Sequence, residues 1–311
     1  MPRPIPFLFC RYEMLVDEEP LDTVGQLQAL ESIKGRLFPH GPKATREDVR
    51  DILVMRPRRF AVAEETVLTW SMGHRPGVRR RTRYNAETDT LDRSVNADDH
   101  TVFTDFIAVP RLGAMAIDDR VSEEYMGARS ALSRLRSAFQ NVDGGSFQGR
   151  LLAPGDVSAI VEQLDLKEYS YSVRRYNPHT RSALAKQFSE ALESEGIFTN
   201  RGVAKPAPGS VMKSGEGIIG GTAGLADDGY GVVGFRGITP SGRTAHLPKP
   251  KFSTDKDENL REQAKEQRLR VFFEANDDDD LIASVVAELV RFYGDDGTPP
   301  IPEVPSGGLA A

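Results

Sequence analysis

One stretch of the chain concentrates arginine. Between Val54 and Arg83 there are eight arginines and two acids, Glu64 and Glu65, so this segment has a net charge of +6 (eight minus two), whereas the whole chain carries −6 at pH 7. The eight are Arg56, Arg58, Arg59, Arg75, Arg79, Arg80, Arg81 and Arg83. A guanidinium group presents a planar fork of donors that suits phosphate oxygens. Arginines at alternate positions of one strand can therefore line up along a phosphate backbone.

Two aromatic residues accompany these arginines. Trp70 and Tyr84 could stack on unpaired bases, because every base offers a flat π-face to an aromatic ring. The alternative interpretation is a solvated edge strand, on which charges deter pairing with another sheet. The segment therefore predicts either contact with DNA or RNA, or a protected sheet edge, and the sequence leaves both open.

A second group of residues could hold a metal ion. Asp98, Asp99, His100 and Asp105 offer carboxylate oxygens and one imidazole, which can ligate Mg²⁺ or Mn²⁺ in a phosphodiesterase. This pattern gives a second hypothesis, metal-dependent nuclease activity, and it is the single reason to expect a cofactor. The competing interpretation is a polar turn before a strand.

The glycine-rich segment from residue 209 contains Gly215-Glu-Gly-Ile-Ile-Gly220, which fits G-x-G-x-x-G. A dinucleotide site also needs an apolar strand before the glycines and a helix after them, yet this segment continues with more glycines. Flexible or closely packed backbone is one explanation, and a loop that clamps a nucleic-acid backbone is the other. The clamp would consist of Gly215, Gly217, Gly220 and Gly221.

Several chemistries lack their usual signatures. The chain has no G-x-S-x-G elbow, no P-loop and no kinase motif, so its status as an enzyme stays open. Cys10 is the only cysteine, which excludes an intrachain disulfide and a multi-cysteine zinc site. Its apolar neighbours predict a buried structural thiol.

Hydrophobic periodicity predicts elements for the first half of the chain. Strands are expected at 6–16, 59–71, 78–84, 101–109 and 112–117, with a turn at 73–77 that would join the second of these to the third. Helices are expected after Asp22, which would act as the N-cap, from Thr45 to before Pro57, and from Ser122.

The second half alternates helices and strands. Helices are expected at 156–164, 181–195 and 281–293, the last with four aspartates at its N-terminus, and strands at 167–176 and 230–236. These elements predict an α+β fold with an antiparallel or mixed sheet and flanking helices, possibly in two subdomains. We expect domains at 1–143 and 144–296, and a disordered proline-rich tail at 297–311.

The N-terminus lacks a signal peptide and no stretch is apolar enough to span a membrane, so the sequence predicts a cytoplasmic protein without membrane contact. Possible partners are DNA or RNA, and a protein partner or a second copy of the chain. A third hypothesis is a protein-interaction scaffold whose tail recruits partners through the P-x-x-P segment at Pro302–Pro305.

Two segments, Glu168–Pro178 and Asp227–Phe235, resemble uncharacterised bacterial proteins that are carried with mobile elements and phage-defence genes. This resemblance covers less than half of the chain and supplies no catalytic residues. It implies a component of a multi-protein antiviral defence or mobile-element system, in which a nucleic-acid-associated or assembly role is expected.

Overall fold

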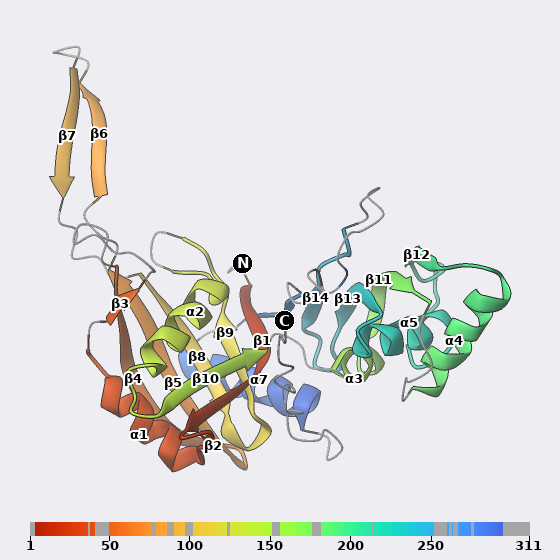
Figure 1. Ribbon diagram of the computed structural model, residues 1–311, viewed down its shortest axis with the longest axis horizontal. Helices are drawn as coiled ribbons and strands as arrows, with labels where there is room; N and C mark the ends of the chain where they lie inside the picture. The colour runs from red at the N-terminus through yellow and green to blue at the C-terminus, as the bar shows by residue number, and fades with distance from the viewer. Residues whose placement is uncertain are drawn as a thin grey trace, which may run out of the picture. The chain divides into compact units, whose positions relative to one another are not determined.

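The computed structural model (Figure 1) describes residues 4–36, 38–40, 50–75, 79–85, 90–96, 102–122, 125–150, 156–175, 182–212, 214–251, 260, 263, 267–274 and 277–294. The chain divides into two compact units: Met1–Arg150 with Arg268–Leu289, and Leu151–Gln267 with Val290–Ala311. The division therefore falls after 150, not after 143, because the strand that ends at Arg150 pairs with the first strand of the chain. The proline-rich segment 297–311 lies outside the described residues.

The first unit is built on an antiparallel sheet with the strand order β15-β1-β9-β8-β5-β4-β3, and β10 and β2 also pair with β1. The α+β prediction is confirmed. The strands are β1 (Ile5–Val16), β2 (Glu19–Pro20), β3 (Phe38–His40), β4 (Arg50–Val62), β5 (Glu65–Arg75), β8 (Val102–Val109), β9 (Ala114–Asp118), β10 (Gly145–Arg150) and β15 (Leu269–Phe273). A short 3₁₀ helix, η1 (Pro110–Leu112), joins β8 to β9.

Strand β1 is apolar on both faces because it lies inside the sheet and is covered on both sides. Phe9 and Cys10 are each 0% exposed, so the buried thiol is confirmed. Helices α1 (Thr23–Ile33) and α2 (Ala128–Phe139) pack on β4 and β5. As predicted, the side chain of Asp22 caps α1, and its carboxylate accepts a hydrogen bond from the Gly25 amide at 2.7 Å. Helix α7 (Asp278–Tyr293) carries its acids in its first turn.

Residues 50–56 form part of strand β4 and not the helix that the capping-box pattern predicted; residues 45–49 lie outside the described part of the chain. Pairing with β5 overrides the local helix signal, as tertiary context often does. The register shifts between Met55 and Arg58, so β4 contains a bulge at Arg56 and Pro57. Proline is tolerated at a bulge because no ladder hydrogen bond needs its missing N–H.

The strand expected to return at 78–84 is β6 (Arg79–Asn85), but its partner differs from the one predicted. β5 pairs with β4 and β8, whereas β6 pairs with β7 (Thr90–Asn96) in a separate two-stranded sheet. The predicted hairpin between these strands is therefore wrong: residues 73–75 belong to β5 in the main sheet, and residues 76 and 77 lie outside the described residues.

The second unit has an antiparallel sheet with the strand order β12-β11-β13-β14. Its elements are α3 (Asp156–Glu162), β11 (Asp165–Arg174), α4 (Ala183–Ser194), β12 (Thr199–Ala204), α5 (Gly217–Asp227), β13 (Gly231–Ile238) and β14 (Thr244–Leu247). Helix α5 packs on β11 and β13, and α3 and α4 pack against α5.

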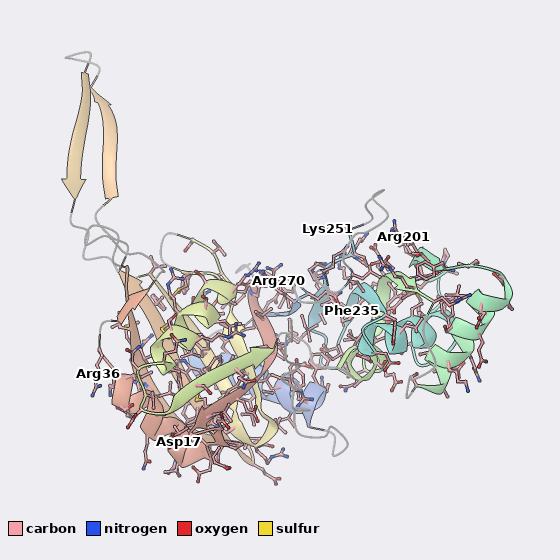
Figure 2. All side chains as sticks on the ribbon, in the orientation of Figure 1. Asp17, Arg36, Arg201, Phe235, Lys251 and Arg270 are labelled. Carbon is pink, nitrogen blue, oxygen red and sulfur yellow. The ribbon has the colours of Figure 1, made fainter. Side chains whose placement is uncertain are left out.

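The core of this unit lies between α5 and the sheet. Tyr169 and Phe235 stand directly opposite each other on β11 and β13 and are buried; Phe235 is labelled in Figure 2. The Tyr169 hydroxyl forms a hydrogen bond of 2.9 Å with Thr222 of α5. Asp227 at the end of α5 accepts hydrogen bonds from the Val157 and Ser158 amides, both 3.0 Å, and so caps α3.

Among the described residues, no helix combines the length and apolar character needed to cross a membrane.

Candidate nucleic-acid interface

The arginine-rich ribbon is the first part of the candidate interface. β6 and β7 are seven residues long each and pair throughout their length. Arg79, Arg81 and Arg83 occupy alternate positions of β6, and alternate residues of a strand share one face. The positions of these three arginines on β6 are therefore compatible with the expectation that alternate arginines line up along one strand.

The partner strand adds to the positive charge. β7 contributes Arg93, which stands opposite Thr82, and one acid, Asp92, which stands opposite Arg83. The arginines of the two strands are Arg79, Arg80, Arg81, Arg83 and Arg93. The ribbon therefore has a net charge of +4 (five minus one) in fourteen residues, seven from each strand.

The arginines at the bulge of β4 do not continue this row. Arg56 has φ 51°, a left-handed conformation that non-glycine residues seldom adopt, and the bulge changes the direction of its side chain. Arg58 and Arg59 follow as successive strand residues, so they belong to opposite faces. Both are exposed, and neither forms an ion pair with a residue that the structure describes.

Trp70 is a core residue and not a stacking platform. Its side chain is 1% exposed, and its ring stacks on Phe106 with centroids 4.9 Å apart. A base cannot reach a ring in this position, so the stacking role predicted for Trp70 is wrong. Tyr84 lies on β6 opposite Leu91, and Arg75 is the last residue of β5; their predicted roles stay predictions.

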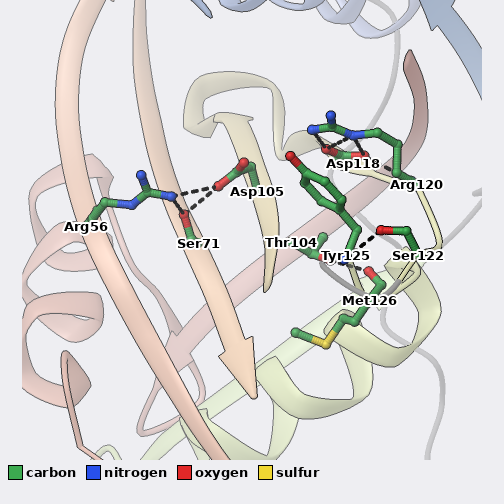
Figure 3. Close-up of polar contacts among 9 residues, drawn as sticks. All are labelled: Arg56, Ser71, Thr104, Asp105, Asp118, Arg120, Ser122, Tyr125 and Met126. Carbon is green, nitrogen blue, oxygen red and sulfur yellow. Dashed lines mark hydrogen bonds and ion pairs between the residues drawn. The ribbon is translucent and has the colours of Figure 1, made fainter. Parts of the chain in front are cut away.

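A polar pocket lies beside Arg56 (Figure 3). Ser71 of β5 stands opposite Asp105 of β8 in the sheet, and its hydroxyl donates a hydrogen bond of 2.5 Å to the Asp105 carboxylate. Arg56 donates to the Ser71 hydroxyl at 2.7 Å and lies 3.4 Å from the same carboxylate oxygen. The bulge thus directs one arginine of the basic segment onto a carboxylate of its own molecule.

A second ion pair lies near the first. Arg120 binds the carboxylate of Asp118 through both Nε and Nη2, and its guanidinium lies over the Tyr125 ring at 3.8 Å from the centroid (Figure 3). Asp118 is 1% exposed, so this pair is held in a fixed geometry. The Thr104 hydroxyl donates a hydrogen bond to the Met126 carbonyl, and this bond positions the segment that carries Tyr125.

The two ion pairs and Ser71 line a pocket of about 160 Å³. Polar side chains, including Arg58 and Thr69, form one part of its wall, and Phe7, Leu281 and Ile282 form the apolar part. Three arginines (Arg56, Arg58 and Arg120) and three aspartates (Asp105, Asp118 and Asp278) line the pocket, so it is close to neutral. It can accept a small ligand that offers both hydrogen-bond donors and acceptors, and it lacks the charge excess of a phosphate site.

Burial raises the pKa of Asp105 above its usual value, and the hydrogen bond from Ser71 partly opposes this shift. We therefore expect Ser71→Ala to raise the pKa of Asp105 further. Because the folded-state pKa of Asp105 lies above its unfolded-state value, its contribution to stability is fully present below the unfolded pKa and is lost as pH rises through the folded pKa. Ser71→Ala should therefore enlarge this loss and extend it to higher pH. Carboxyl ¹³C NMR titration of both proteins measures the shift.

The matched control for this variant is Ser32→Ala, because the Ser32 hydroxyl donates to the Ala29 carbonyl on α1 and touches no carboxylate. It should leave the titration of Asp105 unchanged. An unchanged or lowered pKa of Asp105 in Ser71→Ala would show that the hydroxyl does not stabilise the ionised carboxylate.

The structure tests the predicted metal site only in part, because it describes one of the four predicted ligands. Asp105 is engaged by Ser71 and Arg56, and across the described residues no group of three potential ligand side chains comes together. Asp98, Asp99 and His100 lie outside the described residues, so a site that includes them stays a prediction.

The predicted glycine clamp coincides with the start of α5. Gly217, Gly220 and Gly221 are helical residues, and Gly215 precedes the helix. A Cβ atom built on Gly220 would lie 2.9 Å from Leu184 Cδ1, and one on Gly221 would lie 2.8 Å from Phe188 Cβ. These two glycines let α4 approach α5 closely, which confirms the interpretation as closely packed backbone and leaves no open loop at Gly220 and Gly221.

Sequence reasoning missed Ser71, Asp118, Arg120 and Tyr125. Ser71 and Asp118 lie in apolar strands and are drawn together with Asp105 by cross-strand register, which has no local signature. The available signal was the Asp118-Asp119-Arg120 run at the end of an apolar strand, where a buried acid would need a cation.

No protein-family model and no curated protein sequence matches this chain.

Proposed function

We propose that this protein binds nucleic acid through the ribbon β6–β7, as a non-enzymatic component of a larger assembly. The observation that carries the proposal is the register of the ribbon, which puts five arginines and one acid on two short paired strands. In a chain whose net charge is −6, a local charge of +4 needs a cause. A polyanion supplies one, because Arg and Lys contacts to phosphates release counterions.

The dimensions of such a ribbon suit a nucleic-acid backbone. The major groove of B-form DNA admits a two-stranded β-ribbon. Alternate residues of a strand lie about 6.6 Å apart, close to the axial rise of two nucleotides, about 6.8 Å. Arginines at positions 79, 81 and 83 can therefore meet every second phosphate along one strand. Such contacts position a protein and carry little sequence information.

The resemblance of the second half to proteins of mobile elements and phage defence supports an assembly context for this binding. We place the protein in such a system as the subunit that holds DNA or RNA. The pocket around Asp105 has no part in this proposal, because Arg56 and Arg120 are paired with carboxylates of the same chain and its arginines do not outnumber its aspartates.

The direct test is Arg81→Ala combined with Arg83→Ala in the full chain. Fluorescence anisotropy with labelled DNA and RNA should show weaker binding for every sequence, and the plot of log affinity against log salt should flatten by about 1.4 to 1.8 for two lost phosphate contacts.

The matched control is Lys34→Ala with Arg36→Ala, which removes two exposed cations next to the end of α1. Unchanged binding of the ribbon variant at low salt would overturn the proposal. So would an equal loss in the control, because the effect would then depend on net charge alone.

A further inference from the structure

The second unit carries a basic surface on the face of its sheet opposite α5. Tyr169 contacts α5, so the residues that alternate with it on β11, among them Glu168 and Ser172, belong to the other face. The register places Arg236 directly opposite Glu168, and Arg201 directly opposite Ser172. Residues directly opposite each other share a face, so both arginines lie on the side away from α5.

A chain segment adds lysines to this face. After β14, Pro248–Lys251 crosses the sheet at Gly234, where a Cβ atom would lie only 2.4 Å from the Pro248 carbonyl oxygen. The missing side chain therefore lets the segment lie directly on β13. Gln263 holds it there: its side chain accepts from the Lys251 amide at 3.0 Å and donates to the Lys251 carbonyl at 3.2 Å.

The cations of this face outnumber its acids. Among the described residues, this face carries the exposed cations Arg201, Lys205, Arg236, Lys249 and Lys251 and the carboxylate of Glu168; it also carries Asp165, which is paired with Lys167, so the net charge is +4 (six minus two). In Figure 2, Arg201 and Lys251 extend from the same side of the unit.

Two observations show that the cations gather closely. Lys249 and Lys205 both contact Glu168, the latter at 3.6 Å, and the hydrogen bond from Lys249 is the main reason that the pKa of Glu168 lies below its usual value. Arg236 and Lys251 form no ion pair with any residue that the structure describes.

The acids of this unit's helices are placed elsewhere. Glu162 lies on α3, and Glu190 and Glu193 lie on α4, on the side of the sheet where α5 packs. The charge of this unit is therefore unevenly distributed: one face of the sheet is basic, and the helices on the other face are acidic. Such a distribution orients a polyanion toward the strand face before contact.

We propose that this face is a second nucleic-acid site, at which Arg236 and Lys251 contact phosphates and Lys205 and Lys249 reinforce the field. The inference rests on the proposed function for its choice of ligand, whereas its residues belong to a different unit from the ribbon. Lysine and arginine contacts to phosphates carry no sequence information, so binding at this face is independent of sequence.

The test is Arg236→Ala with Lys251→Ala in the full chain, because neither side chain has an ion pair with a described residue to lose. With labelled oligonucleotides at 0.1 M salt, we expect affinity to fall about 25- to 60-fold and the salt slope to drop by about 1.4 to 1.8, for two lost phosphate contacts. The control is Lys186→Ala with Lys34→Ala, two exposed lysines on α4 and α1, whose removal changes net charge equally.

A second variant tests the same face through an expected increase in affinity. Glu168→Gln removes its carboxylate and frees two lysines, so we expect about 5- to 8-fold tighter binding at 0.1 M salt. A variant that failed to fold could not give this result.

The ribbon and face variants fail in different ways. If nucleic-acid affinity falls in the ribbon variant alone, the second site is overturned and the proposed function stands. If affinity falls in the face variant alone, the second site is supported and the binding role of the ribbon is overturned. Unchanged nucleic-acid binding together with lost binding to vesicles containing phosphatidylserine would overturn the inference in favour of an anionic membrane surface.

Discussion

Replacing Trp70 by alanine is expected to destabilise the first unit by about 3 to 5 kcal/mol, the range for truncating a large buried aromatic. Trp70 is 1% exposed and its ring is stacked on Phe106 at an interplanar angle of 14°. It lies on β5 in the middle of the sheet, between β4 and β8. The cavity left by alanine would be lined by strands that cannot collapse independently. Chemical denaturation followed by circular dichroism measures the loss.

A second substitution at this position distinguishes a role of Trp70 in the core from a role in nucleic-acid binding. Trp70→Phe keeps most of the apolar area and removes an indole N–H that has no hydrogen-bond partner among the described residues, so it should cost far less than alanine. Its affinity for DNA and RNA should equal that of the wild type. Trp70 is the only tryptophan of the chain, so its blue-shifted emission should stay constant when nucleic acid is added.

The control is Phe198→Ala, because Phe198 is 64% exposed and its truncation should change stability by less than about 0.5 kcal/mol. If Trp70→Ala weakened nucleic-acid binding at unchanged stability, or if nucleic acid quenched the tryptophan, the ring would be accessible and its placement in the core would be contradicted.

Local signals predicted the elements that depend on local interactions. Asp22 caps α1, as its position before an amphipathic run indicates, and the periodic apolar residues of α2, among them Leu135 and Phe139, are buried. The acids before Leu281 begin α7. These features could be inferred because capping and helix periodicity depend on residues within one or two turns of each other.

Strand pairing could not be predicted in the same way. The turn signals at 73–77 favour a hairpin between its flanking strands, yet β6 pairs with β7 and β5 pairs with β8, about 35 residues further along the chain. β15 also returns to β1 from the far end of the sequence. Such contacts depend on the register and burial of distant strands, which a single sequence does not display.

The candidate site was likewise predictable only in part from the sequence. Charge counting found the basic segment, since charge is a property of the sequence itself. It could not tell that the bulge at Arg56 directs this arginine onto Asp105, whereas Arg58 stays without an ion pair among the described residues. The basic face of the second unit was also missed, because Arg201, Arg236 and Lys251 are widely separated in the chain and are brought to one face by strand register and by the crossing of Pro248–Lys251 at Gly234.

The glycines of α5 give the second large expected effect. Gly221→Val should destabilise the second unit by about 3 kcal/mol, the upper part of the usual range for overpacking. Its Cβ would meet Phe188 Cβ at 2.8 Å and the Leu184 carbonyl oxygen at 3.3 Å. A Cβ atom is fixed to its own backbone, so neither neighbour can rotate away and α4 must separate from α5. The higher helix propensity of valine offsets only a fraction of this cost.

Because the only tryptophan belongs to the first unit, its fluorescence does not report on this change. Hydrogen exchange of peptides from α4 and α5, measured by mass spectrometry, should show faster exchange in Gly221→Val. The control is Gly215→Ala, since a Cβ at Gly215 meets nothing closer than 3.7 Å and should be tolerated. If valine were accepted at Gly221 while Gly215→Ala weakened nucleic-acid binding, the glycines would serve a ligand, and the close packing of α4 on α5 would not be what requires them.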